Sequence, residues 1–153
     1  MATAPPSLKS RALRLLAARE HGRTELERKL GGPEVDAREL RRVLDDLQAK
    51  GFINEQRVID SVVHRRAPRL GSLRIRHELQ TKGLDADAVA EAVVALQATE
   101  LERARDVWRR KFGAEPGRDA AERARQMRFL AGRGFQAAVV RRVVNTGEDC
   151  AED

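Results

Sequence analysis

The chain has 153 residues, a formal net charge of +6, and 41% hydrophobic and 35% charged residues. It has no tyrosine, four phenylalanines and one tryptophan, a composition that suits helices and disfavours a β-sandwich. No apolar run approaches a membrane span, and the single cysteine, Cys150, excludes an internal disulfide. We therefore expect a cytoplasmic helical protein whose basic balance favours a polyanionic partner: nucleic acid, an acidic protein face or anionic lipid.

The first expected elements are a disordered arm over residues 1–9 and a three-helix unit over residues 10–51. Apolar residues recur at helical spacing in three segments of this unit. Thr24, with a glutamate three residues later, resembles a capping box for the second segment, and Asp36 can cap the third. The third segment closes at Lys50 and then Gly51, which is expected to be left-handed.

Two further three-helix units follow, over residues 52–98 and residues 99–145, and an acidic tail over residues 146–153 is expected to be disordered. Ser72 should start a helix whose Leu73 points inward. A second capping box marks the start of the third unit. The polar residues expected to cap helices in these two units are Asn54, Ser72, Asp85 and Thr99.

A repeated helix end supports this division into three units. The pattern Leu-x-x-[Lys/Arg]-Gly-apolar occurs at residues 79–84 and again at residues 130–135, with a degraded copy at residues 30–35. A period of about 50 residues indicates a helical array. The sequence therefore predicts an all-α fold of three tandem three-helix, helix-turn-helix-like repeats in an elongated curved array. The aligned apolar columns are Leu30, Leu79 and Leu130; Val35, Leu84 and Phe135; Leu40, Val89 and Val140; Leu44, Val93 and Val144.

Several conspicuous residues are best interpreted as structural. Gly83 ends a helix before a residue that must return to the core, so a left-handed backbone is expected there. Trp108 lies at helical spacing from other apolar residues, so it is expected in the core and not as a base-stacking platform. Phe129 and Phe135 are interpreted in the same way. With few exposed aromatics, strong single-strand binding by stacking is not supported.

No catalytic constellation stands out. His21, His64 and His77 are dispersed and have no cysteine nearby, which disfavours a metal site. The sequence has no phosphate-binding glycine loop of the G-x-x-x-x-G-K-[ST] type and no nucleophile elbow. We therefore expect no enzyme activity, no metal and no cofactor.

A run of arginines between His64 and His77 is the main candidate for partner binding. The run contains no acidic residue. One alternative is that some of these arginines only complement the dipole at a helix C-terminus, but five exceed what capping needs. A second basic set is diluted by Asp119 and Glu122, and Arg141 and Arg142 could extend it. The candidate residues are Arg65, Arg66, Arg69, Arg74 and Arg76 in the first set, and Arg123, Arg125, Arg128 and Arg133 in the second.

Three ordered motifs resemble the RecX family of recombination regulators. Residues 51–58, Gly-Phe-Ile-Asn-Glu-Gln-Arg-Val, resemble its G-[YF]-[IL]-[DN]-[DE]-x-R-[FV] signature. Residues 71–84 resemble its G-x-x-[RK]-[IL]-x-x-E-L-x-x-K-G-[IL] pattern, and residues 129–135 resemble its F-L-x-x-R-G-F pattern. Asn54 replaces the usual aspartate, and the first unit lacks the basic residue and glycine before Val35.

The resemblance implies a modulator of nine helices that binds the RecA recombinase filament on DNA and suppresses its ATPase and strand exchange. We expect a monomer whose own DNA binding is weak, sequence-blind and directed to phosphates. The alternative is a free-standing helix-turn-helix-like DNA-binding regulator. Such a protein needs base-reading residues where the third helix of a unit begins. Two of the three starts, at Asp36 and Asp85, are acidic, which disfavours insertion beside phosphates.

Overall fold

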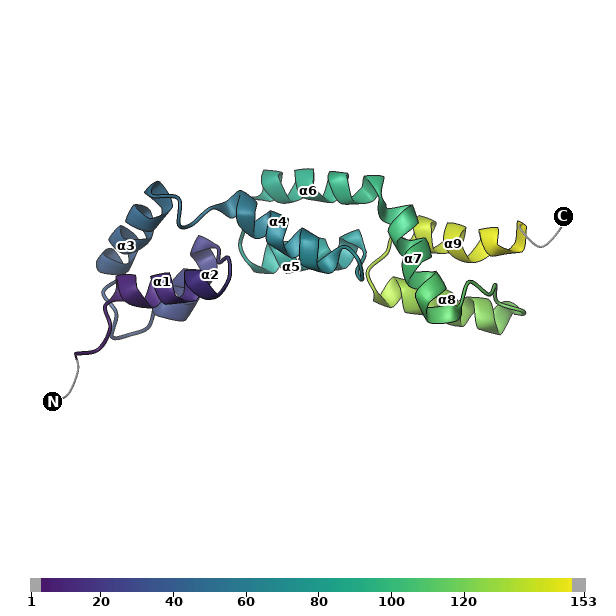
Figure 1. Ribbon diagram of the computed structural model, residues 1–153, viewed down its shortest axis with the longest axis horizontal. Helices are drawn as coiled ribbons and strands as arrows, with labels where there is room; N and C mark the ends of the chain where they lie inside the picture. The colour runs from purple at the N-terminus through teal and green to yellow at the C-terminus, as the bar shows by residue number, and fades with distance from the viewer. Residues whose placement is uncertain (1–3, 150–153) are drawn as a thin grey trace.

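The computed structural model describes residues 4–149, except for the side chains of residues 146–149. Within these residues the chain forms nine α-helices and no strand (Figure 1). The helices are α1 (Leu8–Ala18), α2 (Arg23–Leu30), α3 (Ala37–Ala49), α4 (Glu55–Arg66), α5 (Ser72–Thr81), α6 (Ala86–Ala98), α7 (Glu100–Phe112), α8 (Ala120–Gly132) and α9 (Ala137–Asp149). The all-α prediction is therefore confirmed.

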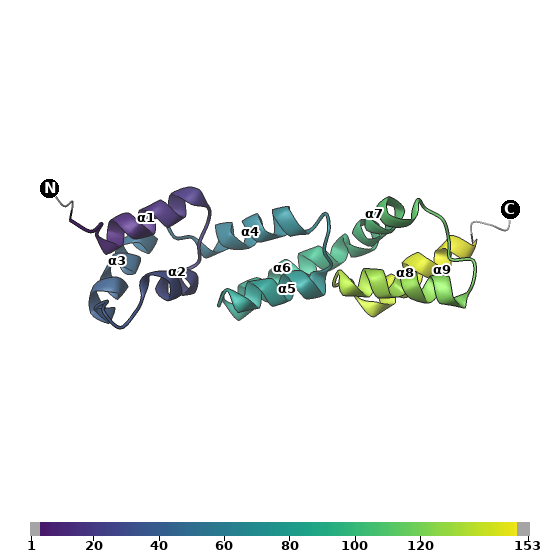
Figure 2. The same cartoon turned by 90° about the horizontal axis from the view of Figure 1, so that it is seen from below.

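The helices form three groups of three that follow one another in a long, slightly bowed row, with the chain ends at opposite ends of it (Figures 1 and 2). We call α1–α3 repeat 1, α4–α6 repeat 2 and α7–α9 repeat 3. Each repeat has its own apolar core. This is the elongated three-helix array that the sequence predicts. The limits proposed for each repeat stay a prediction.

The two ends of the chain are more helical than expected. Helix α1 begins at Leu8, inside the arm predicted over residues 1–9, and α9 continues to Asp149, inside the predicted acidic tail. The remainder of these predictions, at residues 1–3 and 150–153, lies outside the described residues.

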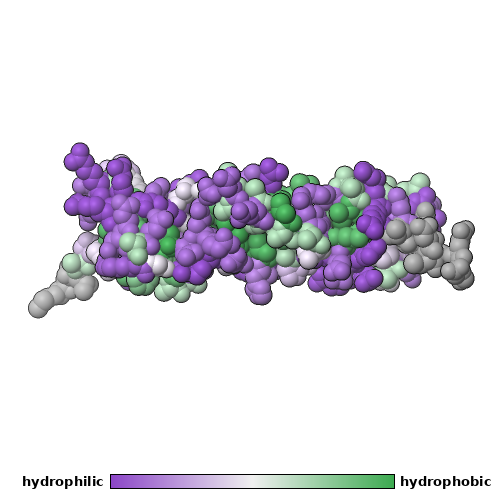
Figure 3. Space-filling model, turned by 90° about the horizontal axis from the view of Figure 1, so that it is seen from above, coloured by the Kyte–Doolittle hydropathy of each residue, from purple (hydrophilic) through white to green (hydrophobic). Residues whose placement is uncertain are grey.

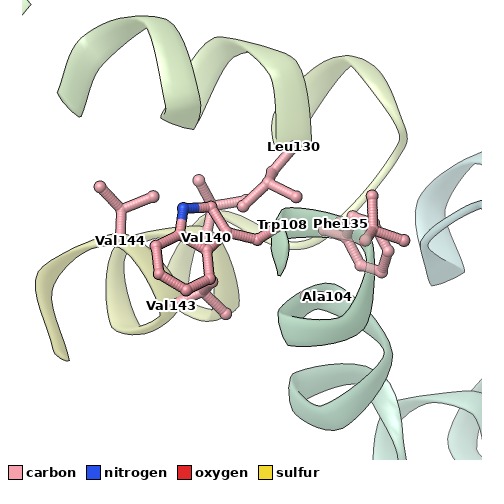
Figure 4. Packing of buried hydrophobic residues seen from close by; sticks show 8 residues of the cluster. Ala104, Trp108, Leu130, Phe135, Val140, Val143 and Val144 are labelled. Atoms are coloured by element: carbon pink, nitrogen blue, oxygen red, sulfur yellow. The ribbon is translucent and has the colours of Figure 1, made fainter. Parts of the chain in front are cut away.

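The core of repeat 3 surrounds Trp108 (Figure 4). The indole is 7% exposed, and its Nε1 donates to the Oε1 of Gln126 at 3.0 Å. Phe135 is 1% exposed, so the core predictions for Trp108 and Phe135 are confirmed. Phe129 packs against the same core but stays partly exposed.

Three of the predicted N-caps are confirmed. Asp36, Asn54 and Asp85 each precede a helix, and their side-chain oxygens accept hydrogen bonds from amides in the first turn. Each bond satisfies a backbone donor that has no partner within its helix.

The predictions for Thr24, Ser72 and Thr99 are wrong. Helix α2 starts after Gly22 and α5 starts after Gly71, so Thr24 and Ser72 lie inside the first turn. Thr99 does precede α7, but its hydroxyl donates back to the carbonyl oxygen of Leu96 at 3.4 Å and caps no amide. The spacing of polar residues in the sequence does not show where a helix begins to within two residues, so it placed the caps of α2 and α5 too late.

The glycine prediction at helix ends is confirmed. Gly51 has a φ of 81° and Gly83 a φ of 71°, both in the left-handed region, and Gly134 in the corresponding position of repeat 3 has 89°. Repeat 1 differs, because Gly31 after α2 has a φ of −72°. The degraded copy of the motif therefore corresponds to a different helix end.

Candidate partner-binding surface

Repeats 2 and 3 are joined by backbone hydrogen bonds between the loop before α5 and the loop after α8. The amide of Gly71 donates to the carbonyl oxygen of Arg133 at 2.8 Å, and the amide of Leu73 donates to that of Gly134 at 3.0 Å. A Cβ atom at Gly71 would collide with the backbone of Gly134 and Phe135. Glycine is therefore required for this approach, which fixes the position of Arg133 beside repeat 2.

A buried carboxylate completes this junction. Glu100, the first residue of α7, is 0% exposed. Its two oxygens accept from the Ser72 amide at 3.1 Å, the Ser72 hydroxyl at 2.8 Å and the Gln136 amide at 3.2 Å. The negative charge thus lies at the N-termini of both α5 and α9, where the helix dipoles and unpaired amides favour it.

Arg103, one turn further along α7, binds the opposite kind of helix end. Its Nη1 donates to the carbonyl oxygens of Ala67 at 3.0 Å and Leu70 at 2.8 Å, and its Nη2 donates to that of Leu96 at 2.9 Å. Burial lowers the pKa of Arg103, while the charge of Glu100 opposes this effect. The guanidinium thus lies at the C-terminal ends of α4 and α6, where the helix dipoles favour a positive charge.

Beside this junction the structure forms a groove of about 250 Å³ whose rim is cationic, which we call the cationic groove. The guanidinium carbon of Arg133 lies 5.1 Å from the centre of the Phe129 ring, and the Nζ of Lys111 lies 5.3 Å from it. Both distances are typical of cation–π contacts. The groove is lined by Arg69, Val107, Arg110, Lys111, Phe129 and Arg133.

The cations of this groove are not neutralised by carboxylates. Within the described part of the chain, none of its four basic side chains forms an ion pair. Arg110 donates instead to the carbonyl oxygen of Pro68 at 2.6 Å, which holds the guanidinium without cancelling its charge. Clustered like charges repel one another, so an anionic ligand would gain attraction and relieve that repulsion.

The arginines of the first predicted set do not gather in the cationic groove; Arg66 and Arg74 line a neighbouring groove instead. Arg66 forms an ion pair with Glu78 at 3.1 Å, and Arg65 donates to the carbonyl oxygen of Ser61 in its own helix at 3.4 Å. Arg74 donates to the carbonyl oxygen of Gly132 at 3.3 Å and so contributes to the junction. Arg76 is exposed on α5, and only Arg69 of this set lines the cationic groove.

The second set lies along α8 and at its end. Arg125 lies 6.0 Å from the centre of the Phe112 ring, Arg128 is exposed and Arg123 is partly buried. Arg133 lies in the cationic groove, so the structure brings one member of each set together. Sequence reasoning missed Arg110 and Lys111, although the run of three basic residues that ends α7 was a visible signal.

Known proteins are similar to this chain both in sequence and in architecture. The model of the third three-helix domain of RecX matches residues 98–144, and that of the second matches residues 54–93. A regulatory protein RecX from Leptothrix cholodnii is 57% identical over 142 residues, which are 93% of this chain and 90% of the relative. The chain belongs to the RecX family of regulatory proteins.

Other RecX proteins are also similar to this chain in sequence or in fold. The regulatory protein RecX of Ralstonia nicotianae is 45% identical over 149 residues, covering 97% of this chain and 93% of its own length. A crystal structure of RecX from Lactobacillus salivarius superposes with a TM-score of 0.76 over 92% of this chain and 94% of that one, at 17% identity. At that identity the likeness shows the fold alone.

Two other kinds of feature are absent from the part of the chain that the structure describes. Among residues 4–145, whose side chains the structure describes, no group of three or more His, Cys, Asp or Glu side chains is placed to hold a metal ion. None of the helices in residues 4–149 is long and apolar enough to cross a membrane.

Proposed function

We propose that this chain binds the RecA–DNA filament and modulates, mostly by inhibition, its ATPase and strand-exchange activity in recombination and DNA repair. The observation that carries the proposal is the cationic groove, which combines four cations without ion-pair partners in a member of a family of regulatory proteins. The chain acts as a cytoplasmic monomer in this proposal, without a cofactor of its own.

The long shape of the molecule supports a filament as the target. Repeats arranged in a row expose an extended surface, which suits a partner that is itself long (Figure 1). The groove cations can contact phosphates or acidic side chains of such a partner. Phosphate contacts carry no sequence information, so binding to DNA alone should be weak and should decrease steeply with salt.

The partner-binding residues in this proposal combine the two predicted sets with the two residues found in the structure. Arg69 and Arg133 have the central role, because they line the groove from opposite sides of the repeat 2–repeat 3 junction. The full set is Arg65, Arg66, Arg69, Arg74, Arg76, Arg110, Lys111, Arg123, Arg125, Arg128 and Arg133.

The experiment is a titration of the protein into a RecA ATPase assay on single-stranded DNA, with a DNA-only binding control. The parent should suppress hydrolysis at levels well below one protein per recombinase subunit. The double variant Arg69→Ala/Arg133→Ala should need several-fold more protein, and more so at low salt, where screening is weakest. The matched control Arg38→Ala/Arg41→Ala removes two exposed arginines from α3 and should act as the parent does. Unchanged ATPase and strand exchange at equimolar parent protein would contradict the proposal.

A free-standing DNA-binding regulator is the second candidate, because each repeat has three helices. The helix starts give it little support. Asp36 and Asp85 cap α3 and α6, and the amide before α9 is occupied by the buried Glu100. Tight, salt-resistant binding to one duplex sequence in the DNA-only control would favour this candidate over the filament.

A further inference from the structure

Helix α6 differs from the rest of the chain in its charge. The protein has 30 lysines and arginines, but none lies among the 13 residues of α6, whose only charged residues are Asp87 and Glu91. Val94 is 67% exposed, the highest value among the exposed large hydrophobic residues. The exposed apolar residues of α6 are Ala86, Ala90, Val94, Ala95 and Ala98. A solvent face of this composition, in so charged a chain, indicates a surface that is covered by a partner.

A groove of about 340 Å³ runs between α4 and this apolar helix, and we call it the α4/α6 groove. Its walls are mostly apolar, and on α6 they are mostly alanines, which leave room that larger side chains would fill. Figure 3 views the molecule from the α6 side and shows hydrophobic surface near the middle of the row. The groove is lined by Gln56, Ile59, Asp60, Val63, Ala67, Ala88, Glu91, Ala92, Ala95, Leu96 and Thr99.

The charge of the α4/α6 groove is acidic on both walls. Asp60 lines it from α4 and Glu91 from α6, and no basic residue is among the lining residues. Gln56 donates to Asp60 at 2.9 Å, and neither carboxylate has an ion-pair partner within the described residues. In a protein with a net charge of +6, this groove therefore selects for positive charge at the rim and apolar side chains at the floor.

We propose that the α4/α6 groove docks a basic amphipathic helix of a partner protein. Apolar side chains of that helix occupy the space over Ala88, Ala92 and Ala95, which follow one another at i, i+4 and i+7 along α6. Its lysines or arginines reach Asp60 and Glu91. An amphipathic helix in an apolar groove is a recurring recognition mode, read through anchors at this spacing. This surface is separate from the cationic groove, and the proposal does not depend on the proposed function.

Charge decides between this occupant and a second copy of the chain. Two copies that met symmetrically through α6 would bring Asp60, Asp87 and Glu91 of each close to those of the other, with no lysine or arginine in the groove to offset them. Like charges across an interface oppose association. A basic partner helix brings no negative charge to the interface, and its cations attract the carboxylates of the groove.

The test uses the full chain and two synthetic helical peptides of about 14 residues, which is about four turns and matches the length of α6. One peptide has leucines at helical spacing and lysines elsewhere, and the other replaces each lysine with glutamate. Amide chemical shifts of the isotope-labelled protein are followed by NMR during titration. The lysine peptide should shift the amides of α4 and α6 in saturable fashion, and the glutamate peptide should not.

Two substitutions on α6 distinguish the groove from general electrostatics. Ala95→Arg places a cation in the groove, and Ala90→Arg adds the same charge at an exposed site of the same helix that does not line it. We expect Ala95→Arg to weaken binding of the lysine peptide about tenfold or more, and Ala90→Arg less than about twofold. Circular dichroism verifies that both variants keep their helix content.

Four results would overturn the proposal: no peptide-dependent shifts in α4 or α6, equal binding of the two peptides, equal loss in the two variants, or groove shifts that depend on protein concentration alone. The last would assign the groove to a second copy of the chain.

Discussion

The two junctions between repeats are built from different kinds of contact. The junction of repeats 2 and 3 uses backbone hydrogen bonds at Gly71 and Gly134 and the buried Glu100. The junction of repeats 1 and 2 uses side chains near the surface. There, Arg57 pairs with Glu20 at 2.9 Å, Lys82 pairs with Glu25 at 3.5 Å, and Arg28 donates to the carbonyl oxygen of Thr81 at 3.0 Å.

This difference indicates how firmly each junction is held. A buried carboxylate with three donors tolerates little displacement, because each lost hydrogen bond leaves a buried polar group unsatisfied. At the other junction, Arg57–Glu20 is an exposed ion pair of the kind worth about 0–1 kcal/mol and screened by salt, and only Lys82–Glu25 is partly shielded from water. Repeats 2 and 3, which carry the cationic groove between them, therefore form the more rigid pair, while repeat 1 is attached by weaker contacts.

The largest loss of stability is expected when the carboxylate of Glu100, at the junction of repeats 2 and 3, is removed. Glu100→Ala leaves the buried amides and hydroxyl at Ser72 and Gln136 without an acceptor, and should lower the free energy of unfolding by about 2–4 kcal/mol. Urea denaturation measures this change. Glu102→Ala removes an exposed glutamate from the same helix and should cost less than about 0.5 kcal/mol. Equal stability of the two variants would show that Glu100 does not hold the junction.

An intermediate effect is expected at Gly83, which lies at the weaker junction. Its φ of 71° is unfavourable for residues with a Cβ, and a Cβ there would also lie within 3.0 Å of the Thr24 side chain in repeat 1. Gly83→Val should lower stability by about 2 kcal/mol, because strain and a steric clash add.

Thermal unfolding measures the effect of Gly83→Val, with the exposed Gln80→Ala as the control that should change little. Adding Thr24→Ala to Gly83→Val removes the two Thr24 atoms that would lie 2.9 Å from the new Cβ, which relieves most of the clash but leaves the backbone strain. This double variant should therefore recover only part of the loss. Full recovery would assign the whole effect to the junction and none to the left-handed backbone.

The smallest effect concerns Glu25, whose charge joins repeat 1 to Lys82. Burial alone would raise the pKa of Glu25, but a hydrogen bond from Arg19 and the charges of Lys82 and Arg19 lower it from 4.5 to about 2. A carboxyl group with a lowered pKa stabilises the fold above its ordinary pKa and loses that contribution as the pH falls. The contribution should therefore be complete above about pH 5 and be lost towards about pH 2.

Glu25→Gln should cost about 1 kcal/mol near neutral pH, because the pair is only partly shielded from water. The difference in melting temperature between parent and variant should shrink as the pH is lowered from about 5 to about 2. A difference that stays constant with pH would mean that the charge of Glu25 does not contribute.

Much of the fold could be predicted from local patterns. The spacing of apolar residues predicted the helices, and the repeated Leu-x-x-[Lys/Arg]-Gly motif predicted the three repeats and the left-handed conformation of Gly83. The orientation of each helix was less predictable. Leu73 was expected to point inward but is 49% exposed, because Ser72 and Ile75 occupy the buried side of α5.

The candidate site was only partly predictable because it depends on contacts between distant residues. Arg69 and Arg133 were both proposed, but their meeting depends on the backbone hydrogen bonds at Gly71 and Gly134, which no local pattern reveals. The second capping box indicated Thr99 as the polar residue that matters at the start of α7, whereas the neighbouring Glu100 holds the junction through partners in α5 and before α9. Arg66 was a candidate for a free cation and pairs with Glu78, just beyond the arginine run.

The short connection between α6 and α7 limits how sequences of this kind can change in length. Only Thr99 separates the end of α6 from Glu100, the first residue of α7. One inserted residue would change the position and direction of α7 relative to α6 and move Glu100 away from Ser72. The loops at residues 31–36 and 113–119 are longer, so insertions and deletions should be tolerated better there than at Thr99.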